Sequence, residues 1–368
     1  MTDDKNLIKI IGQKKVENIL YRIIQSNKIP HALLFTGKEG VGKEYAAIEF
    51  AKALINNSTV QNKDHILNSI QKLNEPYIKY ICALPRGKNE NENDSPYEKL
   101  KQNEINFIQK EFEKKSNNPY YEINIPNANN IKINSIRDIN KFISFAEVEQ
   151  FKRVIVISNA HLMKEEAQNA LLKNLEEPPN NVIFILTTPH PELLRDTIIS
   201  RCWRVVFENL SSSDVERILI EYFKISEEDS RKVSQISMGS VKVALDYLKY
   251  DINFLLDKTI KLLRYSFGKK FNQAIQEIST IASDKILLKL ILSLTSVWLS
   301  YYNKIRLTDT HIPLEQFNET IRKFFEKYPN VDVTETMNLI EEYQINLDRN
   351  VNPNIVSSNF VIQLSSLI

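Results

Sequence analysis

The feature that most constrains the fold is a cluster of glycines near the start of the sequence. Three of the seven glycines, Gly37, Gly40 and Gly42, fall within six positions in the segment GKEGVGKE. A short apolar run at 32–35 precedes them, and a helical pattern begins near Lys43. Gly37, Gly42 and Lys43 match the spacing G-x-x-x-x-G-K of a phosphate-binding loop, which joins a strand to a helix. The sequence therefore predicts a P-loop α/β domain.

The residue types in this loop suit the binding of phosphate. Glycines allow backbone N–H groups to converge on phosphate oxygens at a helix N-terminus, whose dipole favours negative charge. Lys43 is expected to reach the terminal phosphates. The other interpretation of the segment is a tight strand-to-helix turn with no ancestry in nucleotide binding. The strand before the loop and the helix after it favour the phosphate loop.

Two positions that ATP hydrolysis needs are altered. A Ser or Thr normally follows the loop lysine and holds Mg²⁺ through its hydroxyl, but this chain has Glu44. A carboxylate at that position lies close to a triphosphate and repels it. The strand 153–157 is followed by Ser158 and Asn159, where a working P-loop ATPase carries acidic residues that hold the metal and activate water. We therefore predict no intrinsic ATPase activity and weak or absent ATP binding.

Short apolar runs alternate with helical patterns up to about residue 207, which predicts a parallel sheet covered on both faces. Strands are expected at 32–35, 154–157, 182–186 and 205–207. Helices are expected at 16–24, from 43, at 134–145 and at 167–175. Between 56 and 120 the composition turns polar, and 88–94 and 114–118 are predicted to be loops or mobile surface. We assign no task to the polar stretch 85–118.

After residue 208 the pattern becomes helical. Ser211–Asp214 offers N-cap residues for one helix, and Gly239-Ser240 fits a break between two small helices. Longer amphipathic helices are predicted at 255–266, 285–303, 314–327 and 334–347. The predicted organisation is a P-loop α/β domain at 1–207, a helical lid at 208–250 and a helical domain at 251–368. We expect this last domain to carry an oligomerisation surface.

Charge and composition exclude several classes of function. The 48 Lys and Arg balance the 46 Asp and Glu, so the chain lacks the basic stripe of a protein that holds DNA alone. Neither Cys82 and Cys202 nor the five histidines show metal-ligand spacing, and no metal site is predicted. Residues 1–10 lack a signal-peptide pattern, and the apolar stretch 286–298 is expected to be too polar to span a bilayer. We expect a cytoplasmic protein with no membrane partner.

Several segments resemble the clamp-loader branch of the AAA+ family. They arrive in order at workable spacing and cover most of residues 5–207. These segments are Ile8–Lys15 (IKIIGQKK), Ile29–Phe35 (IPHALLF), Asn169–Lys173 (NALLK), Leu175–Pro179 (LEEPP) and Thr197–Cys202 (TIISRC). The resemblance implies an AAA+ P-loop domain with a parallel sheet, a small α-helical lid and a C-terminal α-helical collar domain. The altered Glu44 and Asn159 are similar to the degenerate site of the family's non-hydrolysing subunit.

The resemblance also implies a role in DNA replication. Such a chain is a stator within a DNA-directed DNA polymerase holoenzyme, in a ring with ATP-hydrolysing motor subunits and a clamp-opening subunit. The ring places a sliding clamp on primed DNA. TIISRC resembles the arginine-finger motif of the family, which implies that Arg201 acts in trans on a neighbour's ATP. An ordinary surface or salt-bridged arginine is the alternative.

Two further positions are interpreted through the resemblance. Related proteins commonly insert a four-cysteine zinc module after the P-loop helix, but only Cys82 lies there, so no zinc is expected. Thr187 and Thr188 end a strand where the family senses phosphate, and a hydrogen-bonding role in the turn is the other interpretation.

Two rival functions stay open at this point. One is an active AAA+ ATPase, either a clamp-loader motor subunit or a branch-migration helicase, against which Glu44 and Asn159 argue. The other is a regulatory scaffold derived from a P-loop protein and acting outside replication. ATP turnover by the purified chain distinguishes the first rival, and co-purification with a motor subunit distinguishes the second.

Overall fold

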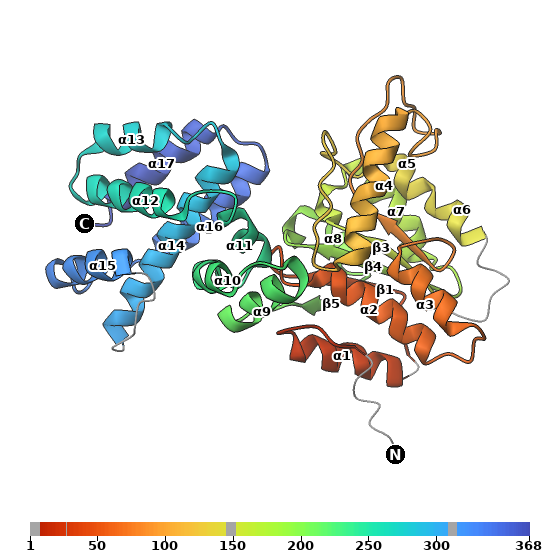
Figure 1. Cartoon of the computed structure of the whole chain (residues 1–368). Helices are drawn as coiled ribbons and strands as arrows, with labels where there is room; N and C mark the ends of the chain where they lie inside the picture. The colour runs from red at the N-terminus through yellow and green to blue at the C-terminus, as the bar shows by residue number, and fades with distance from the viewer. Residues whose placement is uncertain (1–7, 27, 145–151, 308–314) are drawn as a thin grey trace, which may run out of the picture. The chain divides into compact units, whose positions relative to one another are not determined.

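The computed structural model describes residues 8–26, 28–144, 152–307 and 315–368 (Figure 1), and these form two compact units. The first unit holds the described chain up to Asp214 together with 218–224, and the second holds 215–217 and the chain from Ile225 onward. Helix α9 (Ser212–Phe223) therefore contributes residues to both. The further division of the helical part into a lid and a collar near residue 250 stays a prediction.

The first unit is built on a five-stranded sheet with the strand order β2-β3-β4-β1-β5 and parallel pairing throughout. The strands are β1 (Ala32–Thr36), β2 (Ile78–Ile81), β3 (Arg153–Ile157), β4 (Val182–Thr188) and β5 (Trp203–Val206). Leu34 lies opposite Leu186, and Ile155 lies opposite Phe184. Because parallel strands end at the same edge, the segments after β1, β3 and β4 meet there. This edge places the P-loop near the residues that follow β3.

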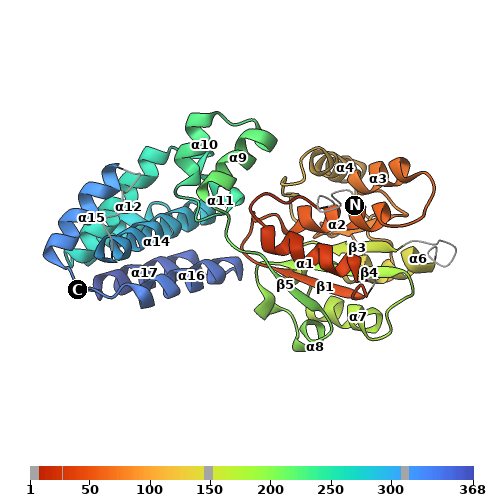
Figure 2. The ribbon, with the colours of Figure 1, turned by 90° about the horizontal axis from the view of Figure 1, so that it is seen from below.

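Helices cover both faces of this sheet, as predicted. One layer consists of α1 (Lys14–Gln25), α2 (Lys43–Asn56), α3 (Lys63–Gln71) and α4 (Gln102–Asn117). The other consists of α5 (Ile133–Arg137), α6 (Ile139–Ser144), α7 (Glu165–Glu176) and α8 (Asp196–Ile199), with short 3-10 turns η3 (Ala160–Leu162) and η4 (Pro191–Leu193). Leu33 and Phe35 face the first layer, and Leu34 between them faces the second. Figure 2 shows α2, α3 and α4 on one side of the sheet and α7 and α8 on the other. The predicted α/β fold class is confirmed.

The second unit is helical in all its described elements. It contains α10 (Glu227–Ser234), α11 (Val241–Tyr247), α12 (Ile252–Phe267), α13 (Phe271–Ser279), α14 (Lys285–Leu307), α15 (Glu315–Lys327), α16 (Thr334–Asp348) and α17 (Pro353–Ser365). Ser240 caps α11 by accepting a hydrogen bond from the Val243 N–H at 3.2 Å. Ser211 caps α9 in the same way through the Asp214 N–H at 3.1 Å. The predicted break at Gly239-Ser240 and the predicted N-cap segment are confirmed.

Helix α14 is more apolar than the sequence analysis expected. Its segment Lys285–Ile305 is long and apolar enough, by length and composition alone, to cross a membrane, and 67% of its apolar window is buried inside the protein. Lys289, one of the polar residues within the stretch 286–298, pairs with Asp348 of α16 at 2.5 Å. The helix therefore has the burial of a core helix within this bundle.

The polar region between 56 and 120 contains more regular structure than predicted. It holds α3, β2 and α4, and Lys114–Asn118, predicted to be a loop or mobile surface, is mostly the last turn of α4. The prediction was wrong because α4 packs against the core through a narrow apolar stripe in an otherwise charged helix. Residues 88–94 form turns, in agreement with the prediction.

Two predicted helices have different bounds in the structure. The helix expected at 134–145 is divided into α5 and α6 by a turn at Asp138. The helix expected at 314–327 begins at Glu315 in α15. Residues 145 and 314 lie outside the described residues.

Candidate nucleotide-binding site

The phosphate loop has the strand–loop–helix context that the sequence predicted. β1 ends at Thr36, and α2 begins at Lys43. Gly37 and Gly42 have φ angles of +146° and +94°, which residues with a Cβ rarely adopt. A Cβ at Gly37 would also meet the carbonyl oxygen of Phe207 at 2.6 Å. Both glycines are therefore required by the path of the backbone.

The side chain of Lys43 lies inside the loop. Its Nζ donates hydrogen bonds to the carbonyl oxygens of Gly37 at 2.7 Å and Lys38 at 2.6 Å. Lys43 is 7% exposed, and this burial lowers its pKa to about 8, although Glu39 and Glu44 act in the opposite direction. The loop's own carbonyls thus use donors that would otherwise be available to a phosphate.

Glu44, the next residue of α2, turns toward the end of β3. One carboxylate oxygen accepts a hydrogen bond from Ser158 Oγ, and the other forms an ion pair with Lys115 Nζ of α4. The side chains of Glu44 and Lys115 are 16% and 2% exposed. Burial on its own raises the pKa of Glu44, but the Lys115 charge and hydrogen bonds from Lys115, Ser158 and Tyr80 outweigh it and hold the pKa below its usual range. Glu44 is therefore an ionised carboxylate in a closed polar cluster.

The two positions that depart from a working ATPase are in contact with each other. Glu44 replaces the usual hydroxyl on α2, and Ser158 replaces an acidic residue after β3, so a hydroxyl and a carboxylate meet with their places exchanged. Asn159 follows with φ +50°, a left-handed conformation that asparagine tolerates better than most residues. Neither Ser158 nor Asn159 supplies a carboxylate that could act as a base toward water.

The threonines at the end of β4 take part in hydrogen bonds of the turn. Thr187 Oγ1 accepts from the Asn159 N–H at 3.2 Å, which ties the segment after β3 to β4. Thr188 Oγ1 accepts from the His190 N–H at 3.0 Å and lies 3.2 Å from His161 Nδ1. These contacts correspond to the turn role that the sequence left open beside phosphate sensing.

The residues beside the loop do not fit the magnesium ion of a P-loop ATPase. The hydroxyl ligand is replaced by Glu44, and both oxygens of that carboxylate are engaged, one by Ser158 and one by Lys115. A divalent cation at this place would have to displace a buried ammonium group of the same sign. Within the described ranges, no three His, Cys, Asp or Glu side chains gather where they could hold a metal ion.

Three tyrosines, which sequence analysis missed, gather beside the start of α2. The ring of Tyr120 lies 5.1 Å from that of Tyr45 and 5.0 Å from that of Tyr222, measured between centroids. A Cβ at Gly42 would lie 3.2 Å from the Tyr120 ring. The Asn118 amide donates to the carbonyl oxygen of Tyr222 at 3.0 Å. The segment after α4 is therefore fixed against the phosphate loop.

Lys115 is the most consequential residue that sequence analysis missed. It lies in the stretch 85–118, to which no task was assigned, and its Nζ donates to the carbonyl oxygen of Tyr121 at 2.7 Å besides pairing with Glu44. The pair joins residues 71 positions apart. The apolar spacing of Ile105, Ile108 and Phe112 could have revealed α4, but no local pattern could have revealed the partner of Lys115.

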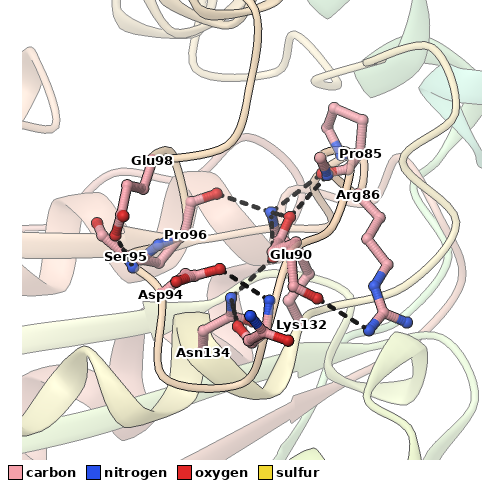
Figure 3. Close-up of polar contacts among 11 residues, drawn as sticks. Pro85, Arg86, Glu90, Asp94, Ser95, Pro96, Glu98, Lys132 and Asn134 are labelled. Atoms are coloured by element: carbon pink, nitrogen blue, oxygen red, sulfur yellow. Dashed lines mark hydrogen bonds and ion pairs between the residues drawn. The ribbon is translucent and has the colours of Figure 1, made fainter.

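The first part of the same stretch is held by a second buried carboxylate (Figure 3). Glu90 accepts hydrogen bonds from the Gly87 N–H and the Asn134 amide, each at 2.7 Å, and pairs with Lys132 at 2.9 Å. Lys132 also donates to the carbonyl oxygen of Pro96 at 2.7 Å. Burial raises the pKa of Glu90, and these donors more than offset that effect, so its pKa lies below the usual range. A polar network thus organises the loop in which relatives were expected to carry zinc.

Arg201 lies between α8 and β5, away from these contacts in the chain. Its guanidinium donates to the carbonyl oxygen of Thr197 at 2.8 Å and pairs with Glu176, the last residue of α7, at 2.9 Å. The side chains of Arg201 and Glu176 are 35% and 49% exposed. The structure therefore shows a salt-bridged arginine near the surface, whose two partners both lie outside the P-loop.

The loop, its place at the carboxyl edge of a parallel sheet and the following helical part define the class: this is an α/β protein with a P-loop. The family described as "DNA polymerase III, delta subunit" matches residues 12–211, more than half of the chain. The chain belongs to this family. Its predicted place among the clamp-loader proteins is confirmed at that level.

Similar proteins carry related names. "DNA polymerase III subunit tau" of Bacillus subtilis (strain 168) is 31% identical over 251 residues, which are 68% of this chain and 37% of that protein. "DNA polymerase III subunit delta'" of the same organism is 29% identical over 209 residues, which are 57% of this chain and 51% of that protein. A gamma subunit-related protein of Thermotoga maritima, of solved structure, covers 95% of this chain and 98% of its own at 17% identity, with a TM-score of 0.38. The chain spans about a third to a half of the length of these curated relatives.

Proposed function

We propose that this chain is a delta-prime-type stator of the DNA polymerase III clamp loader. It assists the ATP-dependent loading of a sliding clamp onto primed DNA in the cytoplasm. It has a degenerate ATP site, does not hydrolyse ATP, and offers Arg201 to the ATP site of a neighbouring motor subunit.

The observation that carries this proposal is the cluster of Glu44, Ser158 and Lys115. A motor subunit needs a hydroxyl on the P-loop helix and an acidic residue after β3, and this chain has neither. The carboxylate that it does have is neutralised by a buried ammonium group. Family membership alone supports a clamp-loader subunit, and this cluster favours a non-hydrolysing one over a motor such as tau.

The place of Arg201 is compatible with a role in trans. Its ion pair with Glu176 is partly exposed, and exposed pairs are worth little, so a neighbouring phosphate can compete for the guanidinium. Nothing in the Glu44 cluster uses this arginine. Trp203, two residues further on, is 59% exposed, which gives the same surface an apolar side chain of the kind that protein interfaces use.

Exposed apolar side chains on two packed helices of the second unit favour a role in assembly. Helix α17 packs against α13, and each exposes a pair of apolar side chains at helical spacing. They are Phe271 and Ile275 on α13, 43% and 39% exposed, and Ile355 and Ile362 on α17, each 56% exposed. Contiguous exposed apolar surface marks sites of protein association. We assign the contact with motor subunits to this α13–α17 surface.

ATP turnover by the purified full-length chain tests the central claim. We expect no hydrolysis above background with Mg²⁺ present, and no tight ATP binding by calorimetry. Turnover that disappears on Lys43→Ala substitution would instead establish an active ATPase.

Reconstitution with motor and clamp-opening subunits tests the assembly. The paired substitution Ile355→Glu and Ile362→Glu should weaken association with motor subunits at least tenfold, because it places two charges in an apolar contact. Phe107→Glu is the control, since Phe107 is 40% exposed on α4 of the first unit. Equal association of both variants would remove the α13–α17 surface from the proposal.

A further inference from the structure

The Glu44–Lys115 pair lies where a P-loop ATPase binds its metal ion. Glu44 stands at the position of the metal ligand, next to the loop lysine. The group that faces its carboxylate is the Lys115 ammonium, a compact positive charge. Ser158, at the position of the second metal-holding group, contacts the same carboxylate. The carboxylate at the position of the metal ligand thus pairs with a cation that belongs to the protein.

Lys115 is buried and held in place by two partners. Its side chain is 2% exposed, it pairs with Glu44, and it donates to the carbonyl oxygen of Tyr121 at 2.7 Å. The segment that supplies this carbonyl is fixed by Asn118, whose amide bonds to Tyr222. An ammonium group taken this far from water is retained only where its partners compensate for the lost hydration.

We propose that the Lys115 ammonium permanently replaces the divalent cation beside the phosphate loop, so that the loop and the first turn of α2 keep their shape without metal or nucleotide. This inference extends the proposed loss of hydrolysis to its physical cause. The proposed role of Lys115 differs from that of an ordinary stabilising ion pair in one respect. Removing an ordinary pair only destabilises the fold, whereas removing Lys115 leaves an anionic pocket that a divalent cation can enter.

Neighbouring lysines of α4 offer a matched comparison. Lys115 is buried, whereas Lys114 is 57% exposed at its side chain and pairs with Glu111 at 2.8 Å. The full-length chain carrying Lys115→Ala is compared with Lys114→Ala by calorimetry, with and without millimolar Mn²⁺. We expect Lys115→Ala to lower the Tm of the first unit by roughly 5–15 °C, as for a broken buried pair. Lys114→Ala should lower it less, because Glu111 keeps its hydrogen bonds from Tyr121 and from the Asn124 N–H.

The response to Mn²⁺ shows whether Lys115 replaces a divalent cation or only forms a stabilising ion pair. We expect Mn²⁺ to recover part of the lost Tm in Lys115→Ala, to leave the wild type and Lys114→Ala unchanged, and to have no effect once Glu44→Gln is added to Lys115→Ala. No recovery in Lys115→Ala, recovery that survives Glu44→Gln, or equal stabilisation of the wild type would each overturn the proposal.

A milder variant covers the case in which Lys115→Ala does not fold. Lys115→Gln keeps a donor for the Tyr121 carbonyl and removes only the charge. Electron paramagnetic resonance should detect one bound Mn²⁺ per chain in Lys115→Gln and none in Lys114→Gln or the wild type. Absence of Mn²⁺ from Lys115→Gln rejects the proposal. These measurements need no partner protein, so they can fail while the clamp-loader assignment stands, or succeed while it fails.

Discussion

Two ion pairs of the first unit use similar chemistry in opposite surroundings. Glu44 and Lys115 are 16% and 2% exposed, whereas Glu176 and Arg201 are 49% and 35% exposed. Breaking a buried pair leaves a charge without hydration, but an exposed pair exchanges its partner for water at little cost. The two charged sites therefore differ in their access to solvent. The Glu44 pair at the P-loop is closed, whereas the Arg201 pair is partly exposed, as the proposed role in trans requires.

The largest effect is expected on ATP hydrolysis when Arg201 is replaced in an assembled complex with motor subunits. Arg201→Ala should leave assembly intact and slow ATP hydrolysis in the adjacent motor by about 10³-fold or more, the range of arginine fingers. Arg195→Ala is the control, because Arg195 is also exposed and pairs with a glutamate of α7, Glu165, at 2.6 Å. Normal hydrolysis and clamp loading with Arg201→Ala would show that this arginine is an ordinary surface residue.

The next largest effect is expected on protein stability when the buried Glu44–Lys115 pair is broken. Glu44→Gln should lower the free energy of unfolding by roughly 3–5 kcal/mol, because it leaves the buried Lys115 ammonium without its counter-charge. Denaturant titration of the full chain measures this change. Glu165→Gln on α7, which breaks an exposed pair with Arg195 at 2.6 Å, should cost less than about 1 kcal/mol. Similar losses for the two variants would contradict the difference drawn between buried and exposed pairs.

The buried loop lysine predicts a dependence on pH. The pKa of Lys43 is about 8 in the folded chain and near its ordinary 10.5 in the unfolded chain. Between these values the unfolded chain binds more protons, so the folded state gains stability as the pH rises. The cost of burying the charge is fully present below about pH 8 and amounts to at most about 3 kcal/mol.

Lys43→Met removes this dependence while keeping an unbranched side chain. The difference in unfolding free energy between the wild type and Lys43→Met should shift in favour of the wild type as the pH rises from about 8 to about 10.5. Taking the difference between two proteins cancels the titration of their shared groups. A difference that stays constant across this range would show that Lys43 is not buried as a cation.

The smallest effect is expected from the partner of Arg201. Glu176→Gln should change the free energy of unfolding by less than about 1 kcal/mol, because its pair is partly exposed. Hydrolysis in the assembled complex should also stay within a few-fold of normal, since Arg201 itself is retained. A loss of several kcal/mol would mean that this pair is as fixed as the Glu44 cluster, and the contrast between the two pairs would fail.

The phosphate loop could be predicted from sequence because its geometry is local. Gly37, Gly42 and Lys43 act within a few residues of one another, and the backbone angles follow from the glycines themselves. The short apolar runs likewise predicted β1, β3, β4 and β5, since buried parallel strands are apolar on both faces. Strand β2 was missed because it is only four residues long and lies within a polar region.

The chemistry that closes the site could not be predicted, because it joins distant segments. Glu44 was expected to repel phosphate as a lone carboxylate, but its partners come from α4 and from the end of β3. Periodicity shows that Ile105, Ile108 and Phe112 share a helical face. It cannot show that Lys115 on that helix reaches the P-loop, since charged side chains reveal their partners only through the tertiary fold.

The contact between Glu44 and Ser158 also has a consequence for the history of this chain. Restoring a threonine at position 44 alone would leave the Lys115 charge buried among hydroxyls. Restoring an aspartate at position 158 alone would press two carboxylates together. Each single step back toward a working ATPase is therefore penalised, and only coordinated change at 44, 115 and 158 escapes the penalty. Under the proposed function, the exchange acts as an evolutionary ratchet: single substitutions can alter the contacts with a neighbouring subunit, but they cannot by themselves build a working ATP site.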